Sequence, residues 1–133
     1  MNVPDPTLSP LPPLLLVMLG GAVGAGLRFL VGEWMLMVAG PGLPFGTWTV
    51  NILGGLAMGL VTGIVARSGT GGEALRLLLA VGVLGGFTTF SAFSLELVTM
   101  IVRGDVILAA AYAVSSVAGS AVALYVGILL VRP

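Results

Sequence analysis

The 133-residue sequence contains no cysteine, no histidine and no lysine. It therefore cannot form a disulfide scaffold, and it lacks the side chains that a zinc site needs. Only 8% of its residues are charged, five arginines and five acids, so the formal net charge is zero. A soluble domain has about 25% charged residues, and a nucleic-acid-binding surface needs clustered basic residues. Hydrophobic residues instead make up 58% of the chain, with a further 21 glycines, which indicates a small integral membrane protein.

The same absences argue against catalysis. No histidine, cysteine or lysine is present to activate a serine nucleophile. Asp5 and Asp105 both lie outside the long apolar stretches, so an aspartyl pair within the membrane is excluded. We therefore expect a protein that is not an enzyme.

Four long uncharged stretches indicate four membrane spans. A helix needs about 20 apolar residues to cross a hydrocarbon core of roughly 30 Å. Barrel strands are shorter and alternate in polarity, whereas a helix satisfies its own backbone in lipid. The sequence thus predicts an all-α membrane protein with spans near 14–38, 46–66, 75–102 and 106–131.

The first 13 residues hold five of the eight prolines and are predicted to form a short arm outside the membrane. Residues 14–133 then form one four-helix transmembrane domain. Both termini share one side of the membrane, which carries Arg67, Arg76 and Arg132, whereas the other carries Arg103 and, depending on its depth, Arg28. This small excess weakly favours cytoplasmic termini and allows insertion in both orientations.

Arg28 and Glu33 lie within or near the end of the first span, and Glu96 lies inside the third. A charge at such depth costs about 2.5–3.5 kcal/mol or more, so it usually faces protein or water. Arg28 either extends to the membrane interface as a structural charge or belongs to an anion or proton pathway. Because Glu33 follows Arg28 by five residues, the two are not neighbours on a helix.

The third stretch, 75–102, is too long for one simple span. Its centre contains Gly85-Gly86 followed by Thr88-Thr89, which are poor residues for a helix interior. We expect the helix to break here, in mid-membrane. Backbone groups freed by a break are tolerated only where they line a cavity or bind an ion, and carbonyls at the end of a half-helix suit a cation.

Polar and aromatic residues mark possible sites on three spans. Asn51 either forms an interhelical hydrogen bond or lines a pore. Phe90 and Phe93 share a face with Glu96, and their ring edges carry partial positive charge that could face an anion, although lipid or core contact explains them equally.

The last span carries Tyr112, Ser116 and Ser120 at intervals of four, so their hydroxyls form one stripe. Such hydroxyls are uncharged donors for a permeating anion, unless the serines bond to their own helix. Glycines at the same interval, Gly20 with Gly24 and Gly55 with Gly59 and Gly63, indicate close helix packing.

Three segments resemble the Fluc (CrcB) family of fluoride channels. They read GGAVGAGLR over 20–28, GTWTVNILG over 46–54 and GGFTTFSAFSLE over 85–96. The resemblance covers all four spans in order, and the pattern TTFS-x-F-x-x-E is its most specific part. Ala92 departs from the pattern, since a hydroxyl residue is common there.

The resemblance implies a passive channel in the inner (plasma) membrane that lets cytoplasmic fluoride escape, built as an antiparallel, dual-topology dimer with two pores. The implied pore residues are Asn51, Phe90, Phe93, Tyr112, Ser116 and Ser120. It further implies that Gly85 and Thr88 donate backbone carbonyls to a structural Na⁺ at the dimer axis, and that Arg28 and Glu96 are buried structural charges. The partners are then fluoride, the lipid bilayer and a second chain, either an identical copy or a paralogue, and no nucleic acid.

Two alternatives stay open. A proton-coupled small exporter of the multidrug type has the same size and span count, but needs a carboxylate in the middle of the first span, whereas Glu33 lies late in it. A structural subunit of a larger membrane complex would explain neither the broken helix nor the hydroxyl stripe.

Overall fold

The structure of the protein is a computed structural model that describes residues 12–131. Most of the proline-rich arm predicted for 1–13, and also Arg132, lies outside the described residues. Pro13 is already the first residue of helix α1, where the N–H that proline lacks would have no helical partner in any case.

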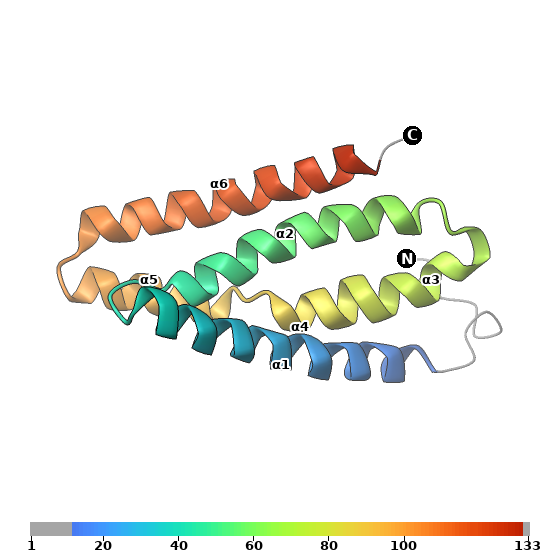
Figure 1. Ribbon diagram of the computed structural model, residues 1–133, viewed down its shortest axis with the longest axis horizontal. Helices are drawn as coiled ribbons and strands as arrows, with labels where there is room; N and C mark the ends of the chain where they lie inside the picture. The colour runs from blue at the N-terminus through green and yellow to red at the C-terminus, as the bar shows by residue number, and fades with distance from the viewer. Residues whose placement is uncertain (1–11, 132–133) are drawn as a thin grey trace.

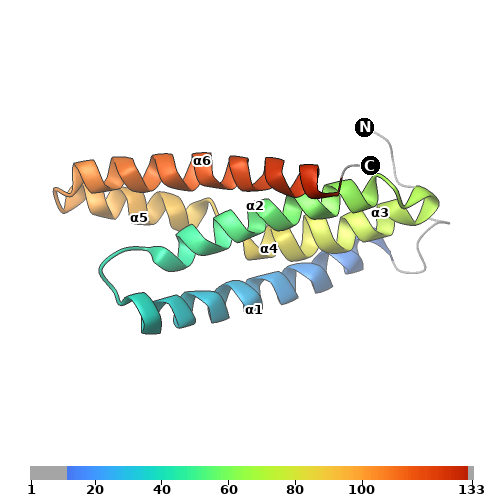
Figure 2. The ribbon, with the colours of Figure 1, turned by 45° about the horizontal axis from the view of Figure 1, so that its top comes forward.

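Four helical spans are long and apolar enough to cross a membrane, which confirms the predicted all-α fold with four spans. Three are single helices, and each begins and ends within one residue of its predicted bounds: α1 (Pro13–Ala39), α2 (Phe45–Val65) and α6 (Val106–Leu130). No strand occurs between residues 12 and 131. Figures 1 and 2 show the four spans lying side by side along the long axis of the molecule.

The third span, Gly69–Val102, is built from several helical segments. In order they are η1 (Gly69–Gly71), α3 (Gly72–Leu75), the π-helix η2 (Arg76–Leu84), α4 (Gly85–Phe87) and α5 (Ser91–Val102). The helical backbone is interrupted at residues 88–90, where Thr88 is extended with φ −78° and ψ 159°. Figure 1 shows this interruption as a non-helical connection between α4 and α5. The sequence pattern does not predict the nine-residue π-helix. Such helices are rare and usually only a single turn long.

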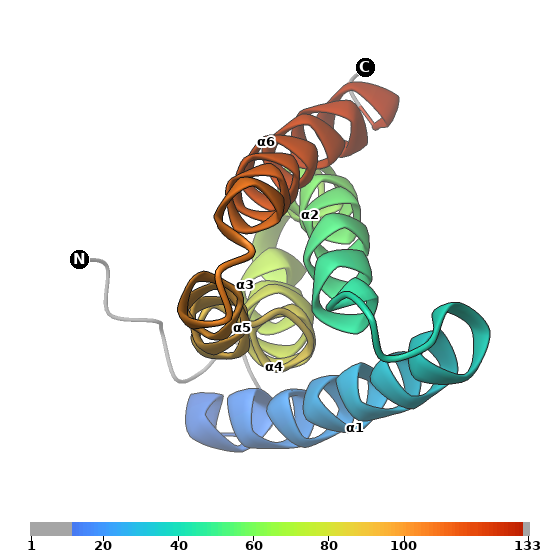
Figure 3. The same ribbon diagram turned by 90° about the vertical axis from the view of Figure 1, so that its left-hand side faces the viewer.

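Glycines allow the helix backbones to touch. A Cβ added to Gly20 of α1 would lie 2.9 Å from the Cα of Gly82 in η2. A Cβ added to Gly59 of α2 would lie 2.9 Å from the Cα of Gly127 in α6. The glycines spaced by four therefore lie at helix contacts, as their spacing predicts. These contacts pair α1 with η2 and α2 with α6, an arrangement seen end-on in Figure 3.

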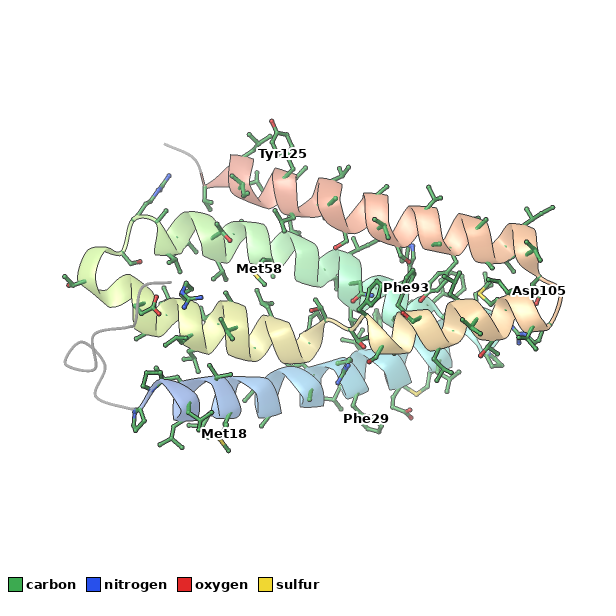
Figure 4. The ribbon with its side chains drawn as sticks, turned by 180° about the vertical axis from the view of Figure 1, so that it is seen from behind. Met18, Phe29, Met58, Phe93, Asp105 and Tyr125 are labelled. Atoms are coloured by element: carbon green, nitrogen blue, oxygen red, sulfur yellow. The ribbon has the colours of Figure 1, made fainter. Side chains whose placement is uncertain are left out.

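The outer surface of the bundle is apolar. Figure 4 shows Met18 and Phe29 of α1 projecting away from the other helices, and both side chains are more than half exposed. The small buried cluster consists of Phe93, Met100, Ala109 and Tyr112, between α5 and α6. Because a soluble protein rarely exposes so much contiguous apolar surface, the protein is a multi-pass membrane protein.

Candidate functional site

A groove of about 610 Å³ lies beside the interruption of the third span. Its walls come from α2, from α4, α5 and the segment that joins them, and from α6, and none of the described residues that line it is charged. Seven of the ten residues predicted for the site line this groove: Asn51, Gly85, Thr88, Phe90, Phe93, Ser116 and Ser120. The other three, Arg28, Glu96 and Tyr112, do not line it.

Asn51 of α2 pairs with the backbone at the interruption. Its Nδ2 donates a hydrogen bond of 3.0 Å to the carbonyl of Thr89, and the Thr89 N–H donates one of 2.9 Å to its Oδ1. The hydroxyl of Ser120 on α6 donates to the backbone carbonyl of Asn51 at 3.0 Å. Asn51 therefore joins α2, α6 and the non-helical connection at one point.

This pairing leaves backbone carbonyls free. In a continuous α-helix the Thr89 N–H would bond to the carbonyl of Gly85, four residues earlier, but here it bonds to Asn51. Thr88 caps the helix end instead, with its N–H and its hydroxyl both donating to the carbonyl of Leu84. Within residues 12–131 the carbonyls of Gly85 and Thr88 accept no hydrogen bond. These are uncharged oxygen ligands of the kind that hold alkali cations.

Three aromatic rings run from the interruption towards α6. Phe90 and Phe93 have centroids 5.6 Å apart with planes tilted by 40°, and Phe93 and Tyr112 are 5.2 Å apart at 43°. Phe93 is 6% exposed, between α5 and α6, whereas Phe90, just before α5, is 76% exposed in the single chain. Tilted rings turn edges towards neighbouring groups, and the edges are the electropositive part of a phenylalanine.

The three hydroxyls of the stripe predicted on α6 differ in their partners. Tyr112 donates to the Glu96 carboxylate at 2.7 Å, and Ser120 donates to Asn51. Ser116 is 3% exposed, and its hydroxyl has no hydrogen-bond partner among the described residues. A buried hydroxyl left unbonded costs about 1–3 kcal/mol. Ser116 thus places a buried hydroxyl in the wall of the groove.

Glu96 is held by hydroxyl groups from two other helices. Its two carboxylate oxygens accept hydrogen bonds of 2.7 Å, one from Thr47 of α2 and one from Tyr112 of α6. It lines a second pocket of about 460 Å³, next to the loop that joins α1 to α2, together with Arg103. Arg28 of α1 is half-buried and forms no ion pair with any acid of the described chain.

One known protein family matches most of this chain. The family model described as "CrcB-like protein, Camphor Resistance (CrcB)" matches residues 15–128. The chain belongs to the CrcB family. Three bacterial relatives carry the name "Fluoride-specific ion channel FluC". The relative from Sphingopyxis alaskensis is 56% identical over 116 residues, which are 87% of this chain and 92% of the relative. Those from Phenylobacterium zucineum and Novosphingobium aromaticivorans are 55% and 51% identical, over 90% and 87% of this chain and 94% and 93% of their own lengths.

The CrcB match extends from α1 to α6, so it includes every residue of the groove and of the Glu96 pocket. Four apolar helices and bacterial relatives together place this CrcB chain in the plasma membrane as a multi-pass protein.

Two residues that bond predicted site residues are missing from the sequence-based prediction, Thr47 and Thr89. Thr47 bonds Glu96, and it lies four residues before Asn51, on the same face of α2, so helical spacing could have found it. The backbone of Thr89 bonds Asn51, and no side-chain pattern could have indicated a contact that depends on main-chain groups.

Proposed function

We propose that this CrcB chain forms a passive fluoride-selective channel through which cytoplasmic fluoride leaves the cell, lowering fluoride toxicity. The curated relatives bear the name of such a channel. The structural observation that carries the proposal is the uncharged groove with an unbonded, buried Ser116 hydroxyl in its wall. The family consists of ion channels, so the protein is not an enzyme.

The chemistry of the groove suits a small anion that binds water tightly. Fluoride gives up that water only where other donors replace it, and a fixed positive charge would hold the ion too strongly to release it. The hydroxyl of Ser116 and the ring edges of Phe90 and Phe93 supply donors without a formal charge. Asn51 also lines the groove, and its amide has a second N–H besides the one that bonds Thr89.

The proposed pore residues have two kinds of role. Ser116, Phe90 and Phe93 face the ion directly. Tyr112 and Ser120 have hydroxyl protons bonded to Glu96 and to Asn51, so they hold the wall of the pore in place. Glu96, fixed by Thr47 and Tyr112, and the half-buried Arg28 are proposed as structural charges.

The interruption at residues 88–90 is proposed to lie in mid-membrane, where two antiparallel copies of the chain meet. The carbonyls of Gly85 and Thr88 from both copies would hold one structural Na⁺ on the axis. Supporting this, both carbonyls are free of hydrogen bonds in the described chain, and Phe90 beside them is exposed. When bound, Na⁺ would neutralise the freed carbonyl dipoles and link the two copies. A homodimer is proposed, with a pair of related chains as the alternative composition.

The experiment is an efflux measurement. Liposomes containing the purified protein are loaded with fluoride, and release is followed with a fluoride electrode, with chloride-loaded liposomes as the control. Rapid fluoride release that does not depend on a proton gradient is expected. Release that requires a proton gradient would instead support the exporter, for which Glu33, exposed on α1, offers no enclosed site.

A further inference from the structure

We propose that Asn51 is a positioning residue for the cation site, because its amide replaces the helical hydrogen bonds of Thr89 and so keeps the Gly85 carbonyl available. The inference rests on the sodium site of the proposed function. It assigns Asn51 a second role besides lining the groove, and it makes the groove and the cation site share one side chain.

The first step is the competition for the backbone of Thr89. A continuous helix would bond the Thr89 N–H to the Gly85 carbonyl and the Phe93 N–H to the Thr89 carbonyl. In the structure both Thr89 groups bond to the amide of Asn51, at 2.9 and 3.0 Å. The amide offers one donor and one acceptor side by side, as a neighbouring backbone would. The interruption therefore exists without an unsatisfied N–H at Thr89.

The second step is the cost of losing the amide. An unbonded backbone group away from water costs several kcal/mol, so without Asn51 the Thr89 N–H gains most by returning to the Gly85 carbonyl. That return would lengthen α4 and remove one of the two free carbonyls from the proposed ligand set. Asn51 therefore favours the conformation that binds a cation.

The third step is the rigidity of the surroundings. The Thr88 side chain packs directly against Gly54, one helical turn after Asn51, so that a Cβ at Gly54 would collide with it. On the opposite side, Ser120 of α6 donates to the carbonyl of Asn51. A substitution at Asn51 would therefore disturb both residues 85–89 and the wall of the groove.

The test measures the backbone rather than the flux. Hydrogen–deuterium exchange of the full chain in lipid nanodiscs is followed in peptides covering residues 85–92, while sodium chloride replaces N-methylglucamine chloride at constant ionic strength. In the parent protein sodium is expected to slow exchange of this segment. In the Asn51→Ala variant the half-saturating sodium concentration is expected to rise at least about tenfold, as for residues that orient metal ligands.

Two matched variants separate this role from general damage. Thr62→Val lies on the same helix and removes a hydroxyl that bonds only its own helix, to Met58, so its sodium response should equal that of the parent. Ser120→Ala removes the bond to the Asn51 backbone and leaves the Asn51–Thr89 pair intact, so the half-saturating concentration should stay within about twofold.

Each outcome decides the inference. A parent-like sodium response in Asn51→Ala overturns it, and Asn51→Ser is measured in the same way if the alanine variant is not monodisperse. Absence of any sodium effect in the parent overturns it together with the sodium site. Sodium-dependent protection in a parent protein that releases no fluoride from liposomes would leave this inference standing and overturn the channel function alone.

Discussion

Before the interruption, η2 and α4 pack against α1 through backbone, whereas after it α5 packs against α2 and α6 through side chains. Gly20 and Gly24 of α1 lie so close to η2 and α4 that neither position has room for a Cβ. Among the described residues, η2 and α4 make no side-chain hydrogen bond to another span, whereas α5 has Glu96 bonded to both α2 and α6. The half of the span before the interruption, η2 and α4, is therefore a tightly packed support, and the half after it, α5, carries the polar and aromatic residues.

The largest effect is expected in α5, the half of the third span that carries the polar and aromatic residues. Phe93→Ile removes the ring that contacts both Phe90 and Tyr112, together with its electropositive edges. Fluoride efflux should fall to the rate of protein-free liposomes, while the protein remains monodisperse. Phe29→Ile, at an exposed position of α1 that lines none of the described pockets, is the control and should conduct like the parent. Parent-like efflux in Phe93→Ile would remove this ring from the pore.

The next largest effect is expected where α1 packs against η2 and α4, the half of the third span before the interruption. A Cβ at Gly24 would collide with the carbonyl of Val83 and lie 2.8 Å from the Phe87 backbone nitrogen. Gly24→Ala should therefore lower the free energy of unfolding by about 1–3 kcal/mol, the usual cost of overpacking. Thermal unfolding in detergent measures it. Gly26→Ala, with open space around its Cβ, should leave stability unchanged or raise it; equal losses in both variants would contradict the proposed backbone contact.

A smaller effect distinguishes two hydroxyls of α6. Ser116→Ala removes an unbonded donor, so fluoride efflux should fall roughly tenfold or more, the value of one hydrogen bond to a charged group. The free energy of unfolding should not fall, because no hydrogen bond within the described chain is lost. Ser120→Ala breaks the hydrogen bond to the Asn51 carbonyl, so it should lower the free energy of unfolding by about 1 kcal/mol. Chemical denaturation and efflux are measured on both variants, and the reverse pattern would exchange the two roles.

The smallest effect is expected at the start of the third span, where α3 joins η2. Glu73 and Arg76 form an exposed ion pair at 2.8 Å, three residues apart on the third span. Exposed pairs contribute about 0–1 kcal/mol, so Glu73→Gln should change neither efflux nor thermal stability beyond that range. A large loss of efflux would show that the start of the span belongs to the ion path.

The sequence allows much of the supporting architecture to be predicted, since span count depends only on where charges are absent. The glycine spacing likewise predicts close contacts, because an interval of four places residues on one helix face. It does not predict which helices meet: Gly20 faces Gly82, and Gly59 faces Gly127. Nor does it indicate the π-helical backbone of η2, which no local residue preference specifies.

The candidate site is less predictable, because its residues are defined by partners far along the chain. The hydroxyl stripe of α6 follows from spacing alone, yet spacing cannot distinguish the unbonded Ser116 from Ser120. The distinction depends on Asn51, which lies 69 residues from Ser120 in the chain. The predicted alternatives for Asn51, a hydrogen bond between helices or a place in a pore, are not exclusive, since it bonds Thr89 and also lines the groove.

The two hydroxyls that hold Glu96 also have an order in time. A ribosome synthesises Thr47 of α2 first, Glu96 of α5 next and Tyr112 of α6 last. A carboxylate entering the membrane without partners is costly. The last helix of the chain therefore supplies the second of these two donors, and a chain that stops before Tyr112 would leave one Glu96 carboxylate oxygen without the hydrogen bond that the structure shows.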